Sequence, residues 1–591
     1  MPDIVRSLER LRKRRRLIQT LKKWVPKLRY LLFAVGICWL FIFPSEQYHK
    51  NTYISENALL PGQVNTYYSW GQVFDATNFR DDISLMSNVS SIKRAVYIEE
   101  GLRKAGLKTA MQNFTVNVSG KKIYGTNVYG LIKAPRADGT EALVLSAPWK
   151  SRDGKTININ GIAAALSLGK FFKGYTYWSK DIIILITDGG EAGVQAWLES
   201  YHDLPRSGIL STPLLLRSGA IQAAINLDFP NTSDYKALGI FFEGVNGQLP
   251  NLDLINTVVR VCRISNHIPI MLHDSGHHYL YDNGDYYASL HNLLQAMKYQ
   301  ALGHPTGSHG LFFRYKIDAI TLYGHTSAPT SNSFSFKEIG SIVESTFRKL
   351  WGKTGNIIEP VPEDGRSKSS SSNENFHAVP LPYNNRPRQI LFPMTVLIVT
   401  HFTGLLIFFV ILNHSSISQM PEMFGMQGFL FTLSLTSSLS IIVPTSLIKI
   451  SQVRSLNNNA PPPRQKPAPN WMILKSFTLA FTAMIISCLS VLNFNLAVFI
   501  SLMVIIPFSL FQPTPQYQIL RYIQLLVLII ISPPGILLFS RTNMEEFLRW
   551  ALMEYELFGN YLLPFICCFY WPNILVYGVI VFSDDEILGK A

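Results

Sequence analysis

Six apolar segments follow one another in the last third of the chain, and they constrain its fold more than any other feature. They lie at residues 388–412, 427–449, 471–491, 492–512, 518–540 and 560–583. Each is close to the ~20 residues that a helix needs to cross a bilayer. Only the short stretch QPTPQ separates the segments at 492–512 and 518–540, which predicts a tight hairpin. We therefore expect a multi-helix transmembrane bundle over residues 388–583.

A seventh apolar run, at residues 30–44, follows a strongly basic start. Residues 1–29 hold eleven Lys or Arg, and only Asp3 and Glu9 oppose them. Such a run could bind nucleic acid, but its place directly before an apolar run favours the positive-inside rule. No small-x-small cleavage site follows, which argues against a signal peptide. We expect a basic cytosolic tail over 1–29, a transmembrane anchor over 30–44 and no nucleic-acid partner.

Residues 45–357, between the two apolar regions, have the composition of one globular domain on the far side of the membrane. Its glycosylation sequons, which suit a luminal domain, are at Asn88, Asn113, Asn117 and Asn231. Cys262 is its only cysteine, so no disulfide can form within it. The Ser-rich, charged residues 358–387 predict a disordered linker, residues 544–559 an interfacial amphipathic helix, and residues 584–591 a C-terminal tail.

Strand-like and helix-like segments alternate in this domain. Strands are expected at 127–134, 142–148, 181–187, 223–229, 238–244 and 318–324, with helices that include 161–173 and 192–202. Such alternation predicts a largely parallel sheet covered by helices on both faces, an α/β/α domain. Functional sites of such folds lie at the carboxyl ends of strands. Asp188 and Asp228 fall at two of these ends.

The strand ends resemble those of the zinc-dependent aminopeptidase fold over residues ~125–330. Where that fold carries metal ligands and a catalytic Glu, this sequence has Pro148, Lys150, Ile157 and Gly190. Two zinc ions need about five nitrogen or carboxylate ligands, so the resemblance implies a degenerate site with no catalytic residue.

Only a few candidate ligands remain in the domain. One interpretation is a divalent metal weakly bound by Asp188, Glu191 and Asp228, with His325 as a further candidate ligand. We prefer the interpretation that these acids cap helices or lie in solvated loops, and we expect no cofactor. The cluster HDSGHH, residues 273–278, also contains possible ligands, but its polar surroundings favour an exposed loop.

Several stretches in the same order, among them NTYISENALLPGQV, FFKGYTYWSKDIIILIT and EGVNGQLPNLDLIN, resemble the glycosylphosphatidylinositol (GPI) anchor attachment protein family of the GPI transamidase. The resemblance implies a non-catalytic subunit in the endoplasmic reticulum membrane that helps to recognise and present the GPI lipid, with a separate caspase-like catalytic subunit as partner. The chain lacks the Q-A-C-x-G signature of such a catalyst. Alternatives are an active membrane-bound metallopeptidase and a transporter, but the apolar segments hold few ionisable residues.

The resemblance also implies a lipid site and exposes one departure. Tyr53 and Ser55, just beyond the first apolar run, match the segment of the family that contacts GPI. Their hydroxyl groups suit phosphate and sugar oxygens; without the resemblance, an interfacial anchor and a helix cap would serve equally well. After STFRKL, where the family continues into a second span, the sequence runs WGKTGNIIEPVPED instead. Seven spans rather than eight would put the two ends of the chain on opposite sides of the membrane.

Overall fold

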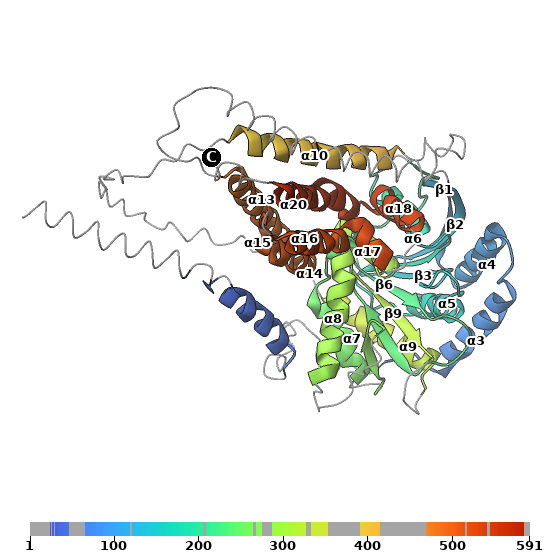
Figure 1. Ribbon diagram of the computed structural model, residues 1–591. Coiled ribbons are helices and arrows are strands. Elements are labelled where there is room, and N and C mark those ends of the chain that lie inside the picture. The colour runs from blue at the N-terminus through green and yellow to red at the C-terminus, as the bar shows by residue number, and fades with distance from the viewer. Residues whose placement is uncertain are drawn as a thin grey trace, which may run out of the picture.

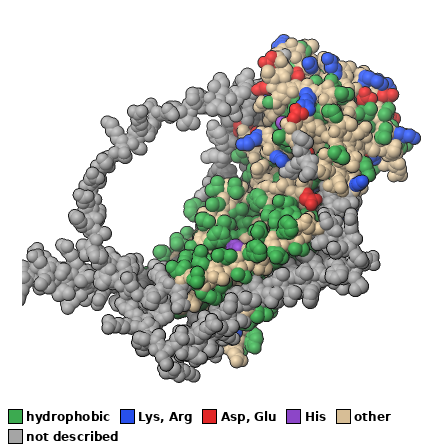
Figure 2. Space-filling model, turned by 90° about the horizontal axis from the view of Figure 1, so that it is seen from above, with side chains coloured by type: hydrophobic (Ala, Val, Ile, Leu, Met, Phe, Trp, Pro, Cys, Tyr) green, Lys and Arg blue, Asp and Glu red, His purple; other side chains and the backbone are tan. Residues whose placement is uncertain are grey.

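The computed structural model separates the chain into an α/β domain and a helical bundle that lie side by side (Figure 1). It describes residues 24, 27–28, 30–45, 66–118, 121–136, 138–204, 208–263, 267–274, 286–326, 333–352, 390–413, 442, 469–514, 517–539 and 544–583. Hydrophobic side chains gather over the bundle, whereas Lys, Arg, Asp and Glu are scattered over the α/β domain (Figure 2).

One nine-stranded sheet forms the centre of the α/β domain, in the order β5-β1-β2-β4-β3-β6-β9-β7-β8. The strands are β1 (Lys108–Val118), β2 (Lys121–Ile132), β3 (Glu141–Pro148), β4 (Asp181–Thr187), β5 (Ile209–Ser211), β6 (Ala220–Asp228), β7 (Ala237–Phe241), β8 (Ile270–Leu272) and β9 (Asp318–His325). All six strands expected from the sequence are present. β1, β5 and β8 were not predicted.

The sheet is mixed, which corrects the expectation of a largely parallel one. The central strands β4, β3, β6 and β9 are parallel to one another. β2 runs antiparallel to β4, β1 pairs antiparallel with β2 and β5, and β7 pairs antiparallel with β9. The cause at one edge is local: only two residues separate β1 from β2, so the strands form a hairpin, and parallel strands would need a long crossover.

Helices cover both faces of the sheet, which confirms the predicted α/β/α architecture. They are α3 (Trp70–Leu85), α4 (Ser91–Lys104), α5 (Ile159–Lys173), α6 (Glu191–Tyr201), α7 (Leu252–Val261), α8 (Tyr286–Leu302), the 3-10 helix η4 (Ser308–Tyr315) and α9 (Phe336–Gly352). In β4, Ile182, Ile184 and Ile186 pack with α5, whereas Ile183 and Leu185 pack with α6. A fully buried strand of this kind reads as a continuous apolar run because both of its faces are covered.

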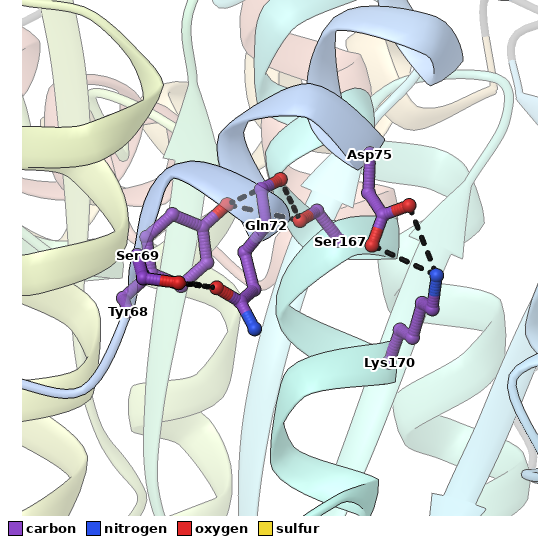
Figure 3. Close-up of polar contacts among 6 residues, drawn as sticks. All are labelled: Tyr68, Ser69, Gln72, Asp75, Ser167 and Lys170. Carbon is purple, nitrogen blue, oxygen red and sulfur yellow. Dashed lines mark hydrogen bonds and ion pairs between the residues drawn. The ribbon is translucent and has the colours of Figure 1, made fainter.

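The first described residues after Ser45 are fixed to helix α5. The Tyr68 and Ser167 hydroxyl oxygens lie 2.9 Å apart, and the Ser167 hydroxyl also donates to the Gln72 carbonyl at 2.8 Å (Figure 3). One turn further along α5, the Lys170 ammonium lies 2.8 Å from the Asp75 carboxylate. These contacts attach α3 to the outer face of the domain.

Three of the six spans expected in the bundle are present as long apolar helices. Three helices among the described residues are long and apolar enough to cross a membrane: α10 (Leu391–Leu412), α13 (Asn470–Leu492) and the continuous helix Leu562–Phe582, which includes α19 (Leu562–Phe565) and α20 (Trp571–Phe582). Shorter apolar helices are Tyr30–Ile42, Phe494–Leu510 (α14 to α15) and Gln518–Ile531 (α16), which α17 (Pro533–Phe539) follows. Apart from Ile442, the span expected at 427–449 lies outside the described residues.

For several bundle helices, hydrogen bonds show which end faces the α/β domain. Asn493, after α13, and Tyr561, before α19, both hydrogen-bond to Asn246 of the domain. The helix Leu562–Phe582 is ~30 Å long, so Phe582 lies at the end of the bundle far from the domain. The helix Tyr30–Ile42 touches the domain through Phe41, near its last residue. Tyr30 and Phe582 therefore both lie at the end of their helix that is away from the domain. The seven spans counted from the sequence would instead put the two ends of the chain on opposite sides of the membrane.

Helix α10 runs antiparallel to the last helix of the bundle. Its second half, with Ile407 and Ile411, packs near the start of the last helix, and its first half packs against the end of that helix. Leu391 therefore lies at the far end of the bundle, while Gly352 ends α9 in the domain. Residues 353–389 lie outside the described part and contain no apolar run of the length of a span.

The segment expected as an interfacial helix packs against the α/β domain at its end. It forms α18 (Met544–Met553) and a π-helical turn, Glu554–Phe558. Leu557 and Phe558 are buried in the α/β domain, in the same apolar cluster as Trp197 and Phe312. The segment therefore joins the bundle to the domain, and its place at a membrane surface stays a prediction.

Candidate functional site

Asp188 lies directly after β4 and is held by an arginine from α4. The Arg94 guanidinium is 2.8 Å from the Asp188 carboxylate, and it also lies over the Trp149 ring at 4.4 Å from the ring centre. The Gly189 amide donates to the other carboxylate oxygen at 2.8 Å. The charge of Asp188 is thus neutralised within the domain.

Asp228 ends β6 and is 1% exposed. Its carboxylate accepts a hydrogen bond of 2.8 Å from the Arg152 backbone amide. Burial raises its pKa to about 6, although this hydrogen bond acts in the opposite direction. The Arg152 side chain turns away to Asp274, which it contacts through two nitrogens at 2.8 and 3.2 Å, and its guanidinium stacks on the Phe241 ring at 3.8 Å from the ring centre.

Glu191, at the first position of α6, lies near the segment that follows α18. Burial raises its pKa to about 7, and its charged neighbours are His304 of the domain and Glu554 of the segment after α18. The His304 Nδ1 atom lies 2.9 Å from a Glu554 carboxylate oxygen. Burial acts to lower the pKa of His304, but the hydrogen bond that its ring donates to Glu554 and the charges of Glu191 and Glu554 outweigh it and raise that pKa.

The structure therefore gives the three candidate metal ligands separate partners. Within the described ranges, no group of three or more His, Cys, Asp or Glu side chains is placed to hold a metal ion. At the positions where the aminopeptidase fold carries ligands, Lys150 is exposed and bridges to Ile157. Gly190 has a φ of 65° and precedes α6. His325, at the end of β9, packs edge-on against Tyr323, with 4.8 Å between the ring centres.

A buried polar cluster that the sequence did not predict lies after β7. The Glu243 carboxylate contacts the His273 Nε2 atom and accepts a hydrogen bond of 2.8 Å from the Thr306 hydroxyl. Glu243 and His273 are both fully buried. Burial acts to raise the pKa of Glu243, but His273 and Thr306 outweigh it and lower that pKa. Nearby, burial lowers the pKa of His309 to about 3, and its Nδ1 atom lies 2.7 Å from the Thr321 hydroxyl.

This cluster corrects the expectation for HDSGHH. His273, its first residue, has no exposed surface and stacks on Tyr299 with 5.0 Å between the ring centres. Asp274 is the partner of Arg152. Residues 275–278 lie outside the described part. The sequence signal was present in the histidine-rich run itself, but nothing local pairs it with Glu243, thirty residues earlier.

A second polar arrangement joins the domain to the bundle. Asn246 has a φ of 63°, and its side chain donates to the Gly559 carbonyl at 3.2 Å and accepts from the Tyr561 amide at 2.9 Å. The Asn493 side chain donates to the Gln300 carbonyl at 2.7 Å and to the Asn246 carbonyl at 3.2 Å. We call this set of contacts the junction. It satisfies backbone groups at the ends of helices on both sides.

The remaining predicted residues are placed as follows. Tyr53 and Ser55 lie outside the described residues, so their lipid contacts stay a prediction. All four sequon asparagines, Asn88, Asn113, Asn117 and Asn231, are exposed. Exposure is what glycosylation requires, and occupancy stays a prediction.

The raised pKa of Glu191 predicts that the folded protein loses stability as the pH rises. The folded-state pKa of Glu191, about 7, is above its usual value of 4.5. Its contribution to stability is therefore full below pH 4.5 and is lost as the pH rises through 7. We expect Glu191→Gln to flatten the pH dependence of thermal unfolding between pH 5 and 8 and to stabilise the protein at pH 8 by about 1–2 kcal/mol, allowing for partial exposure. Glu100→Gln, at an exposed carboxylate, is the control, and equal slopes for both variants would contradict the assignment.

A family model and two curated proteins match this chain. A family model described as "Gaa1-like, GPI transamidase component" matches residues 124–352 and 357–578, well over half of the chain. The chain is 37% identical over 338 residues to the GPI transamidase component gaa1 of Schizosaccharomyces pombe, covering 56% of this chain and 57% of that protein. It is 31% identical over 338 residues to GPI transamidase component GAA1 of Saccharomyces cerevisiae, covering 57% of this chain and 51% of that protein.

Similar solved structures include a zinc aminopeptidase from Bacillus subtilis, with 11% identity, a TM-score of 0.31 and coverage of 47% of this chain and 95% of that one. A glutaminyl cyclase from Porphyromonas gingivalis has 15% identity, a TM-score of 0.30 and coverage of 47% and 98%. The chain spans about half the length of the curated relatives that it matches. The family match, by contrast, includes residues of both the α/β domain and the bundle, over well more than half of the chain, and the chain therefore belongs to the family of Gaa1-like GPI transamidase components.

Proposed function

We propose that this chain is a non-catalytic subunit of a GPI transamidase that helps to recognise and present the GPI lipid for attachment to the C-terminus of proproteins. The family match over both parts of the chain is the observation that carries the proposal. A lipid substrate also suits a chain whose α/β domain is built onto membrane helices through the junction. The cleavage chemistry then belongs to a separate caspase-like subunit, which we propose as a partner.

The environment of the strand-end acids supports a non-catalytic role. Asp188 is paired with Arg94, and Asp228 is buried and bonded to the Arg152 amide. A hydrolytic base has to reach a water molecule and accept its proton, and neither carboxylate is arranged for this. Cys262 is fully buried, and burial raises the pKa of its thiol, which suppresses the nucleophilic thiolate.

We place the chain in the endoplasmic reticulum membrane with the α/β domain in the lumen. The exposed sequons support this orientation, since glycosylation occurs on the luminal side. The basic residues 1–29, next to the far end of the helix Tyr30–Ile42, support a cytosolic location for that end.

Substitution of the two predicted lipid contacts is expected to impair GPI attachment. Tyr53→Ala with Ser55→Ala removes two hydroxyl groups and one ring, and we expect at least about a tenfold loss of GPI-anchored reporter at the surface of cells that carry only the variant. Co-purification of the other subunits should be unchanged. Asn51→Ala, two residues earlier, is the matched control. Normal reporter display in the double variant would contradict the assignment.

Affinity purification of the full chain in mild detergent tests membership of the complex. We expect a caspase-like protein and GPI to elute with it. The alternative, a membrane-bound metallopeptidase, predicts chelator-sensitive cleavage of peptides by the purified chain. Such cleavage by the chain alone would overturn the proposed function.

A further inference from the structure

Helix α8 connects the domain-facing ends of two membrane helices. At its start, the Tyr286 hydroxyl donates to the Phe41 carbonyl at 2.7 Å, at the end of the helix Tyr30–Ile42. At its other end, the Gln300 carbonyl accepts from the Asn493 side chain, between α13 and α14. With seventeen residues, α8 is ~25 Å long. It therefore reaches from one membrane helix to the other.

These contacts put α8 beside the domain-facing ends of two apolar helices. The ends of apolar helices that face the α/β domain mark where the hydrocarbon layer gives way to headgroups. In Figure 1, α8 runs across the direction of the bundle helices and lies between them and the sheet. A helix in this position is oriented to lie along a membrane surface that the bundle helices cross.

The inner side of α8 is used by the protein itself. Tyr299 donates to Asp274 at 3.0 Å and stacks on His273. Asn292 is 6% exposed, and Ala301 packs against the core of the bundle. One face of α8 therefore packs on the α/β domain, and its C-terminal end packs on the bundle.

A different side of α8 is exposed. It consists of Tyr287, His291, Leu294, Lys298 and Leu302, which we call the outer stripe. The spacing of three or four residues puts these side chains on one face of a helix. Three of them are large apolar side chains with exposed fractions of 76%, 47% and 43%, and α8 contains no Asp or Glu.

We propose that the outer stripe of α8 lies in the headgroup layer of the bilayer and binds anionic phospholipid. Tyr is favoured at membrane interfaces, Leu side chains are stabilised at the acyl boundary, and a Lys ammonium pairs with lipid phosphate while its stem covers apolar surface. In water the same stripe would expose leucines at 47% and 43% on a helix with no acid to balance Lys298. The position of α8 between two membrane helices selects lipid as the occupant. This inference does not depend on the proposed GPI-presenting function.

Depth-dependent fluorescence quenching tests the proposal on the full chain. Exposed Cys38 and Cys488 are replaced by Ser, and an environment-sensitive dye is attached at Leu294→Cys. Leu85→Cys is the matched control, because Leu85 is 82% exposed and lies on α3, on the side of the domain away from the bundle (Figure 1). In nanodiscs that contain headgroup spin-labelled phosphatidylcholine, we expect at least about threefold more quenching at position 294 than at position 85.

A second comparison tests the charge. When phosphatidylserine replaces part of the neutral lipid, we expect quenching at position 294 to rise, and Lys298→Gln to remove about a fivefold difference in lipid association. High salt should act like Lys298→Gln, because surface attraction is screened within about 10 Å at 0.1 M.

Two results would overturn the proposal. Equal quenching at positions 294 and 85 would show that the stripe faces water. Absence of lipid quenching at position 294, together with protection from aqueous iodide only when other subunits are bound, would show that the stripe binds a protein. Folding of each labelled variant is checked independently by its thermal unfolding in detergent.

Discussion

Replacing Glu243 by Ala is expected to destabilise the α/β domain by about 3–5 kcal/mol. The carboxylate is fully buried, contacts His273 and accepts a hydrogen bond from Thr306. Its removal leaves a buried imidazole and a buried hydroxyl without their partner, and an uncompensated group in the interior is far more costly than a lost surface pair. For a domain of this size we expect the midpoint of thermal unfolding to fall by about 10 °C.

The control for this prediction is Glu100→Ala, which removes an exposed carboxylate 3.7 Å from Lys104. Exposed pairs of this kind contribute less than about 1 kcal/mol. We also expect Glu243→Ala combined with His273→Leu to be more stable than Glu243→Ala alone, because the second change removes the isolated buried imidazole. If Glu243→Ala unfolded at the same temperature as Glu100→Ala, the buried pair would not be a stabilising element.

Replacing Phe558 by Ala is expected to loosen the bundle from the domain. Phe558 is 4% exposed and packs in the cluster that contains Trp197 and Phe312 of the α/β domain, although it follows α18 in the sequence. Truncation of a buried Phe removes its transfer free energy and leaves a cavity, which together amount to about 3–5 kcal/mol. We expect a lower unfolding temperature and faster proteolysis of the full chain in detergent.

Phe494→Ala is the matched control, since that ring is 60% exposed. Substitutions at such positions usually change stability by less than about 0.5 kcal/mol. Equal proteolysis of the two variants would mean that Leu557 and the hydrogen bonds of Asn246 hold the parts together without the Phe558 ring.

The sequence by itself determined the class of protein and the centre of the domain. Runs such as DIIILIT predict buried strands because a strand covered on both faces is apolar throughout, and β4 has the predicted bounds, 181–187. Apolar segments of about twenty residues predict spans for the same local reason. The acids at the strand ends were also identified from the sequence, because an acidic residue that follows an apolar run can be recognised without knowing what it contacts.

Only the tertiary structure decided what those acids and their neighbours contact. The partners of Asp188, Glu243 and Asn246 are 94, 30 and 315 residues away in the sequence. The hydropathy pattern of a segment does not indicate which distant residues in the sequence it contacts. Likewise, Leu557 and Phe558 look like part of a membrane-surface helix, because an apolar face has the same pattern whether lipid or protein covers it.

The direction of each bundle helix also follows only from the tertiary structure. Hydropathy counts spans but does not show that Leu391 and Phe582 share the end of the bundle away from the domain. That follows from packing, since α10 lies against the last helix over most of its length and is antiparallel to it. The sequence thus determined which segments are apolar enough to be buried, because burial depends on composition and period. The structure decided which surfaces bury them, because that depends on contacts between residues far apart in the chain.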